Sequence, residues 1–165
     1  KNSSVFLGIG TTLQQVALAL KEHPGLTVVT NSINVALTLS NSPNIQVYLA
    51  GGLVRPGDED TMGLDTIAYL SRFNIQYSVF GVGGLCKKGQ LLDFSVEESS
   101  VSNVIMKNSE TRILVADHSK INRYAPLITG NLSEIDILIM DSLSASYKQT
   151  CKSFESEIIE VGTSS

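Results

Sequence analysis

Two polar segments of this sequence combine residue types that bind anions. The first, Gly8-Ile9-Gly10-Thr11-Thr12, lies between an apolar run and a helical pattern. Its glycines let a ligand approach the backbone, and the free N–H groups at the start of a helix attract phosphate or carboxylate. The second, Asp117-His118-Ser119-Lys120, places a carboxylate, a hydroxyl and an ammonium group after another apolar run. We therefore predict an anion site formed by Gly10, Thr11, Thr12 and Lys120.

Both segments also allow interpretations that need no ligand. Thr11 or Thr12 could cap the helix, and Asp117 could form a local ion pair with Lys120 in a turn. The first segment is neither a GxGxxG dinucleotide fingerprint nor a Walker loop, which argues against a nucleotide cofactor. The two cysteines are too few and too far apart for a zinc site or a disulfide framework. The sequence thus predicts no cofactor and no metal.

Other apolar runs also end in glycines or short polar residues, which could line the same ligand pocket. Glu98 opens a predicted helix, where a carboxylate favours the helix dipole, but it could instead accept hydroxyl groups of a ligand. Arg55 could bind an anion, although a solvated surface arginine is the simpler interpretation, and we interpret His118 as an ordinary surface histidine. The predicted pocket consists of Gly8, Thr30, Asn31, Gly51, Gly52, Gly83, Glu98 and Asp117.

The elements that must position these residues are apolar runs that alternate with helical patterns. This alternation predicts an α/β fold with a doubly wound, mostly parallel sheet flanked by helices. Such sheets bind ligands beyond the carboxyl ends of their strands. Strands are predicted at residues 5–9, 26–29, 45–50, 77–82, 111–116, 135–140 and 157–161, and helices at residues 11–22, 32–39, 61–71, 97–107 and 145–154.

Length and charge narrow the classes of function. The 165 residues suit one domain, residues 1–165, with disorder expected only at the Ser-rich ends, residues 1–4 and 162–165. A net charge of −4 without a basic cluster makes the chain a poor partner for DNA phosphates. No apolar run approaches the ~18 residues of a membrane helix, and no signal peptide is evident. We expect a cytoplasmic protein without a membrane partner, and the start at Lys1 suggests a fragment of a longer chain.

Taken in order, these segments resemble the C-terminal sensor domain of the DeoR family of bacterial sugar-metabolism repressors. The resemblance extends from about residue 5 to residue 141. The matching pieces are Gly10-Thr11-Thr12, LTVVTNS at 26–32, LAGGL at 49–53, Gly63, residues 81–83, Glu98 with Val101, VADHSK at 115–120 and IDILIMD at 135–141.

The resemblance implies a fold like that of ribose-5-phosphate isomerase and glucosamine-6-phosphate deaminase. It also implies that Gly10, Thr11 and Thr12, with Lys120 beside them, hold the phosphate of a phosphorylated sugar or similar metabolite. Operator DNA would be bound by an N-terminal winged helix-turn-helix domain that this chain lacks. A homo-oligomer without enzymatic activity is expected.

Two residues depart from the family pattern, and an enzyme is the alternative function. Gly8 stands where family members usually carry aspartate, and Ser78 where they often do. The first departure bears on how the effector's hydroxyl groups would be bound. A sugar-phosphate isomerase or deaminase needs a positioned base, for which Glu98 is the candidate. Isomerases of this superfamily carry paired aspartates where this chain has the glycines of residues 81–84, so we expect a sensor.

Overall fold

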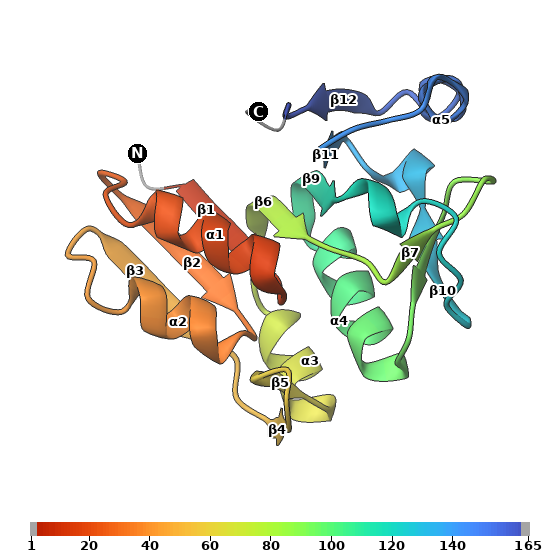
Figure 1. Cartoon of the computed structure of the whole chain (residues 1–165). Helices are drawn as coiled ribbons and strands as arrows, with labels where there is room; N and C mark the ends of the chain where they lie inside the picture. Colours follow the sequence, from red (N-terminus) through yellow and green to blue (C-terminus); the bar gives the residue numbers. More distant parts are fainter. Residues whose placement is uncertain (1–2, 163–165) are drawn as a thin grey trace.

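The computed structural model describes residues 3–162 and centres on a seven-stranded parallel sheet (Figure 1). The strand order is β12-β11-β9-β6-β1-β2-β3, and every neighbouring pair is parallel. The chain runs outward from the β1–β6 pair in both directions, so the topological switch point lies between these two strands. The strands are β1 (Ser3–Leu7), β2 (Leu26–Thr30), β3 (Ile45–Leu49), β6 (Ile75–Phe80), β9 (Ser109–Ala116), β11 (Ile137–Met140) and β12 (Glu157–Glu160).

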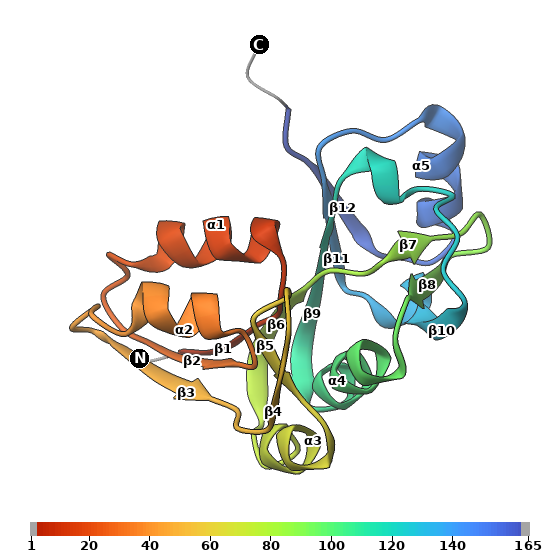
Figure 2. The ribbon, with the colours of Figure 1, turned by 60° about the horizontal axis from the view of Figure 1, so that its bottom comes forward.

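Helices cover both faces of this sheet. Helices α1 (Thr11–Leu20) and α2 (Ile33–Leu39) pack together on one face, and α3 (Leu64–Leu70) and α4 (Val96–Lys107) pack together on the other (Figure 2). The last helix is α5 (Ala145–Lys152), which precedes β12.

Successive strand residues supply two separate cores. Phe6 of β1 and Phe80 of β6 belong to the hydrophobic cluster on one face of the sheet. Leu7 and Val79, the adjacent residues of the same strands, belong to the cluster on the other face. Side chains alternate along a strand, so a strand that is covered on both faces is apolar at consecutive positions. This is why the strands appear in the sequence as unbroken apolar runs, and the predicted fold class is confirmed.

Short antiparallel pieces complete the fold. Strands β4 (Leu53–Arg55) and β5 (Asp60–Met62) form a hairpin. Strands β7 (Gly84–Leu85), β8 (Gln90–Asp93) and β10 (Leu127–Asn131) form a three-stranded sheet, and two 3-10 turns lie at His118–Lys120 and Leu132–Glu134. The sequence pattern predicts none of these strands. It also predicts that the third helix begins at residue 61, whereas residues 61–62 belong to β5 and α3 begins at Leu64.

The chain ends differ in part from expectation. Ser3 and Ser4 are not disordered but belong to β1, where the Ser4 hydroxyl accepts a hydrogen bond of 3.0 Å from the backbone of Gln76. The remaining Ser-rich positions, residues 1–2 and 163–165, lie outside the described residues. No helix among residues 3–162 is long and apolar enough to cross a membrane.

One buried hydroxyl yields a stability prediction. Ser78 on β6 is 0% exposed, and its Oγ has no hydrogen-bond partner within residues 3–162. An unpaired buried polar group destabilises the folded state, so Ser78→Ala should raise the free energy of unfolding by about 1 kcal/mol. Thermal unfolding should show a Tm increase of ~2–4 °C. The control Ser71→Ala removes an exposed hydroxyl bonded to Ala68 and should give no increase. A lower Tm for Ser78→Ala would contradict the prediction.

An ion pair between strand ends yields a pH prediction. His118 lies on the surface as predicted, but its Nδ1 lies 2.6 Å from Asp141 Oδ2, so this histidine is paired with a carboxylate. The hydrogen bond that His118 donates to the Asp141 carboxylate raises the pKa of His118 above its ordinary 6.5. The stabilisation is therefore complete below that ordinary value and disappears as the pH rises through the raised pKa.

Wild-type protein should accordingly lose more Tm than His118→Gln as the pH rises from about 6 to about 8. The control His23→Gln should retain the wild-type slope, because His23 forms no carboxylate pair among the described residues. Equal slopes for wild type and His118→Gln in pH-dependent thermal unfolding would exclude this role of the pair.

Candidate functional site

A cavity of about 330 Å³ opens at the carboxyl edge of the sheet. Its walls come from the segments after β1, β6 and β9, from the β2 end and the β4–β5 hairpin, and from the start of α4. Both the position at the switch point and the volume are typical of small-molecule sites. Nine predicted site residues line it: Gly8, Gly10, Thr11, Thr12, Asn31, Gly83, Glu98, Asp117 and Lys120.

The start of α1 faces the cavity without a side-chain cap. Gly10 is the N-cap residue, with a φ of 110° that glycine tolerates, and no side chain bonds to the first turn. Thr11 and Thr12 lie inside the helix, so neither is the cap that the ligand-free interpretation requires. By contrast, serine hydroxyls cap α2, α4 and α5. The N-terminus of α1 therefore keeps its free donors and its partial positive charge.

The segment after β9 brings two cations to the cavity. Lys120 lines the wall and forms no ion pair within the described residues, so the local pair with Asp117 is not formed. Asp117 instead interacts with Ser119. Hydrogen bonding to the Ser119 side chain, together with a bond of 2.8 Å from Ser119 N to Asp117 Oδ1, lowers the pKa of Asp117. Arg123 also lines the cavity, and its guanidinium lies 5.0 Å from the ring centre of Phe94. Lys120 is thus available for an anion.

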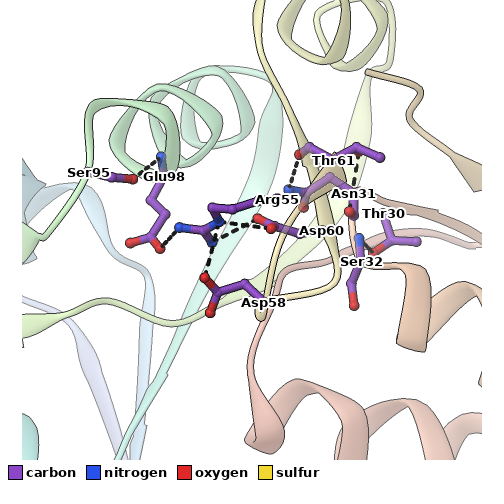
Figure 3. A network of polar contacts seen from close by, with 9 residues as sticks. All are labelled: Thr30, Asn31, Ser32, Arg55, Asp58, Asp60, Thr61, Ser95 and Glu98. Atoms are coloured by element: carbon purple, nitrogen blue, oxygen red, sulfur yellow. Dashed lines mark hydrogen bonds and ion pairs between the residues drawn. The ribbon is translucent and has the colours of Figure 1, made fainter. Parts of the chain in front are cut away.

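Arg55 connects the β4–β5 hairpin to α4 (Figure 3). Its Nε and Nη2 each donate to Asp60 at 3.0 Å, and its Nη1 donates to Glu98 Oε1 at 2.5 Å. The arginine side chain is 16% exposed, which corrects its interpretation as a solvated surface residue. Burial works against its charge, but the hydrogen bonds to Asp60 and Glu98 outweigh burial and raise the pKa of Arg55 far above its ordinary value. Both carboxylates line the cavity, whereas Arg55 lies behind them.

Asn31 brings an unpaired acceptor to the same region. Its Nδ2 donates to the backbone oxygen of Thr61 at 3.1 Å. A carbonyl oxygen can only accept, so this bond fixes which end of the amide is the oxygen. Asn31 Oδ1 is buried and has no partner within residues 3–162, although the residue lines the cavity. Such a group is satisfied when a ligand supplies a donor.

Three residues predicted for the pocket do not line it. Thr30 is fully buried, and its hydroxyl donates to the backbone oxygen of Leu7 at 2.7 Å, so the hydroxyl ties β2 to β1. Gly51 accepts a hydrogen bond of 2.7 Å from the Thr66 hydroxyl. Gly52 has a φ of 146°, and a Cβ there would lie 2.2 Å from the same hydroxyl. These glycines permit close packing of the β3–β4 turn against α3.

Asp93 and Asp60 line the cavity but are missing from the sequence analysis. Asp93 ends β8, is 3% exposed, and accepts hydrogen bonds from Gly83 N at 2.9 Å and Thr129 Oγ1 at 2.6 Å. Burial raises the pKa of Asp93, and these hydrogen bonds offset part of that effect. The available signal was an acidic residue just before the N-cap Ser95, at the end of an unpredicted strand.

The cavity wall therefore carries both cationic groups and hydrogen-bond acceptors. Free N–H groups of α1, Lys120 and Arg123 supply positive potential, and carboxylates and the Asn31 oxygen supply acceptors. No cluster of three or more potential ligands could hold a metal ion within residues 3–162. The arrangement can bind a molecule that carries both an anionic group and hydrogen-bond donors.

Comparisons with known structures agree with the fold. A ribose-5-phosphate isomerase in complex with phospho-erythronic acid matches with a TM-score of 0.51 and 17% identity, over 75% of this chain and 48% of the isomerase. The eIF2B beta subunit of Chaetomium thermophilum matches with a TM-score of 0.54 and 13% identity, over 83% of this chain and 43% of that one. At these identities the likeness concerns the fold alone.

Sequence comparisons identify closer relatives. The chain is 37% identical to the glycerol-3-phosphate regulon repressor of Escherichia coli (strain K12), over 85% of this chain and 56% of the repressor. It is 34% identical to the HTH-type transcriptional repressor CsqR of the same organism, over 95% of this chain and 60% of CsqR. The chain thus spans less than two thirds of these relatives. Residues 1–142 match the family described as the DeoR C terminal sensor domain, and the chain belongs to this family.

Proposed function

We propose that this chain is the effector-sensing part of a DeoR-type transcriptional repressor, and that its cavity binds a phosphorylated sugar or a related metabolite. The uncapped start of α1, open to the cavity of a sensor-family chain, carries the proposal. A phosphate there accepts hydrogen bonds from the first N–H groups of the helix. Gly10 leaves space beside it, and Thr11, Thr12 and Lys120 supply further donors.

The remainder of the effector meets hydrogen-bond acceptors. Glu98 has one carboxylate oxygen bonded to Arg55, and its other oxygen has no partner within the described residues. Asn31 Oδ1 is unpaired, and Asp117 lines the cavity through an exposed carboxylate. Sugar hydroxyls can donate to all three, and Gly8 and Gly83 also line the cavity.

Effector binding would control operator DNA through a segment outside this chain. The described cavity is far too small for a duplex, and the net charge of −4 disfavours contact with DNA phosphates. The two relatives compared above are repressors by name and are longer than this chain. We propose that a cytoplasmic homo-oligomer couples effector binding to the spacing of its DNA-binding domains, as expected for palindromic operators.

An enzymatic role is disfavoured by how the cavity carboxylates are held. Proton transfer between sugar carbons needs a base that is free to take a proton. Glu98 keeps one oxygen without a partner among the described residues, but its charge is balanced by Arg55, and both oxygens of Asp93 accept hydrogen bonds from Gly83 and Thr129. These carboxylates are suited to accept hydrogen bonds from a ligand that leaves unchanged.

A thermal-shift panel tests the phosphate site. A sugar phosphate at 100 times its Kd stabilises the protein by ~2.7 kcal/mol, which raises Tm by several degrees at ~2–4 °C per kcal/mol. We expect this shift with one sugar phosphate and not with the free sugar. Thr11→Glu should abolish it by placing a negative charge at the phosphate position, and Lys120→Ala should reduce it.

The matched control is Lys88→Ala, which removes an exposed lysine outside the cavity and should keep the full shift. Incubation with ribose 5-phosphate should give no ribulose 5-phosphate. An equal shift in wild type and Thr11→Glu would place the ligand elsewhere, and turnover of ribose 5-phosphate would make the chain an isomerase.

Operator binding tests the proposed regulation in the full-length protein. Couplings between effector and DNA sites are typically ~1–3 kcal/mol, so saturating effector should change operator affinity about 5- to 150-fold. The full-length Thr11→Glu variant should bind operator with the same affinity as effector-free wild type, and adding effector should not change that affinity. Fluorescence anisotropy with labelled operator measures both quantities. Equal affinities of the wild type with and without effector would contradict this mechanism.

A further inference from the structure

Strand β3 forms one edge of the central sheet, and its outer side is open. Within residues 3–162 only β2 pairs with it, and the sheet ends there (Figure 1). Ala50 N donates to Thr30 O at 2.8 Å, so the even-numbered residues of this segment direct their backbone groups toward β2. Backbone groups of successive strand residues point to opposite sides. Those of Val47 and Leu49 therefore point outward, where no described residue bonds to them.

The sequence of β3 contains none of the features that protect an exposed sheet edge. Such edges are commonly blocked by charged side chains, by proline or by a bulge. The five residues of β3 include no charge and no proline, and their register with β2 is continuous. No Lys, Arg, Asp or Glu occurs between His23 and Arg55, so the segments on either side of β3 are uncharged as well. This edge is therefore able to accept another strand.

The opposite edge of the same sheet is protected. It is formed by β12, which pairs only with β11 among the described strands. Glu157 and Glu160 are two of its four residues, and both are exposed. Carboxylates on an edge strand oppose pairing with a second strand, because pairing would bring them out of water. One edge of the sheet is thus closed to association and the other is open.

The occupant that the open edge fits is a second copy of β3. An uncharged edge offers nothing to a charged partner, but it complements itself. Two copies can pair antiparallel about a two-fold axis perpendicular to the sheet. Residues with outward backbone groups must then face one another, and the most bonds form when the axis passes beside Val47. Val47 faces Val47 of the partner subunit, and the 40% exposed Leu49 faces the partner's Ile45.

The size of the edge and the two ends of the sheet agree with a closed dimer. Helix α2 packs on one side of β3, and on the other side Tyr48 contacts Phe73, with ring centres 5.4 Å apart. An edge of three such layers measures about 17 Å by about 30 Å, on the order of the ~800 Å² that each partner contributes to a standard interface. After pairing, both free edges are β12, so assembly stops at two copies.

We propose that β3 is a dimerisation edge, through which two copies of this chain pair antiparallel and join their sheets into one. The inference goes beyond the proposed function, which requires a homo-oligomer but does not say which surface forms it. It does not depend on the effector, because the cavity lies at the ends of β1 and β6, and β2 separates β1 from β3.

Sedimentation velocity on this chain tests the inference with a matched pair of variants. Wild type should be a dimer at micromolar concentration. Leu49→Lys places a charge in the contact and should raise the dimer dissociation constant at least tenfold. Ile159→Lys makes the same kind of change on β12, at a residue of similar exposure, 37% against 40%, and should leave the dimer unchanged. Far-UV circular dichroism and Tm establish that both variants are folded.

Cross-linking tests the register and does not need a charged variant. Antiparallel pairing centred on Val47 places the two Gln46 Cα atoms about 8 Å apart. Gln46 is exposed, so Gln46→Cys should be joined to its partner by a short bismaleimide and run as a dimer on a denaturing gel. Ile159→Cys should give no more dimer than wild type, in which Cys86 and Cys151 set the background.

The outcomes distinguish this surface from the proposed function. A monomeric wild type overturns the inference together with the homo-oligomer that the proposed regulation needs. A dimer that tolerates Leu49→Lys, or that Ile159→Lys weakens equally, overturns the inference alone, and so does a dimer in which Gln46→Cys is not cross-linked. The sugar-phosphate thermal shift should persist in Leu49→Lys, because the cavity is intact there, and its loss would overturn the separation of the two sites.

Discussion

The pairing of β1 with β6 is the constraint from which the cavity follows. These strands come from distant parts of the chain, and the register places Val5, Phe6 and Leu7 beside Tyr77, Ser78 and Val79. Because the chain leaves them toward opposite edges of the sheet, their connections diverge and leave a space at the carboxyl edge. The start of α1 enters this space from one face and the start of α4 from the other. Positive potential and acceptors thus meet at one position.

Arg55 stabilises two carboxylates, Asp60 and Glu98, that this topology brings close together. Asp60 and Glu98 come from the hairpin and from α4, and two partly buried carboxylates so close would repel each other without a cation between them. Arg55 is bidentate to Asp60 and reaches Glu98 across 43 positions of sequence. This geometry suits the planar guanidinium, which a lysine ammonium does not reproduce. The hairpin is also bonded to the β2 end through Thr61 and Asn31, so one arginine links three parts of the wall.

The sequence predicts the residues that directly follow central parallel strands and misses those on short antiparallel pieces. Thr11, Asn31 and Lys120 were found because parallel strand ends collect at one edge, and Glu98 was found because it opens a predicted helix. The prediction that Thr30 lines the pocket is wrong because its hydroxyl turns toward Leu7. The same prediction for Gly51 and Gly52 is wrong because they follow β3, an edge strand far from the switch point. Asp60 and Asp93 lie on strands of three and four residues, too short to show a period. An ion pair such as Arg55–Glu98 depends on the tertiary fold and leaves no local pattern.

Gly8 shows how the acceptors of this chain are distributed. It lines the cavity just after β1, so this position contributes no side-chain acceptor. A Cβ there would lie 3.3 Å from Cβ of Phe80, which leaves little space for a side chain without movement of β6. The acceptors come instead from Asn31, from Asp60 on the hairpin and from Asp93 and Glu98 around the start of α4. The site therefore depends on the segments that Arg55 joins. A shift of the β4–β5 hairpin would move Asp60 and change the position of the acceptors on the cavity wall.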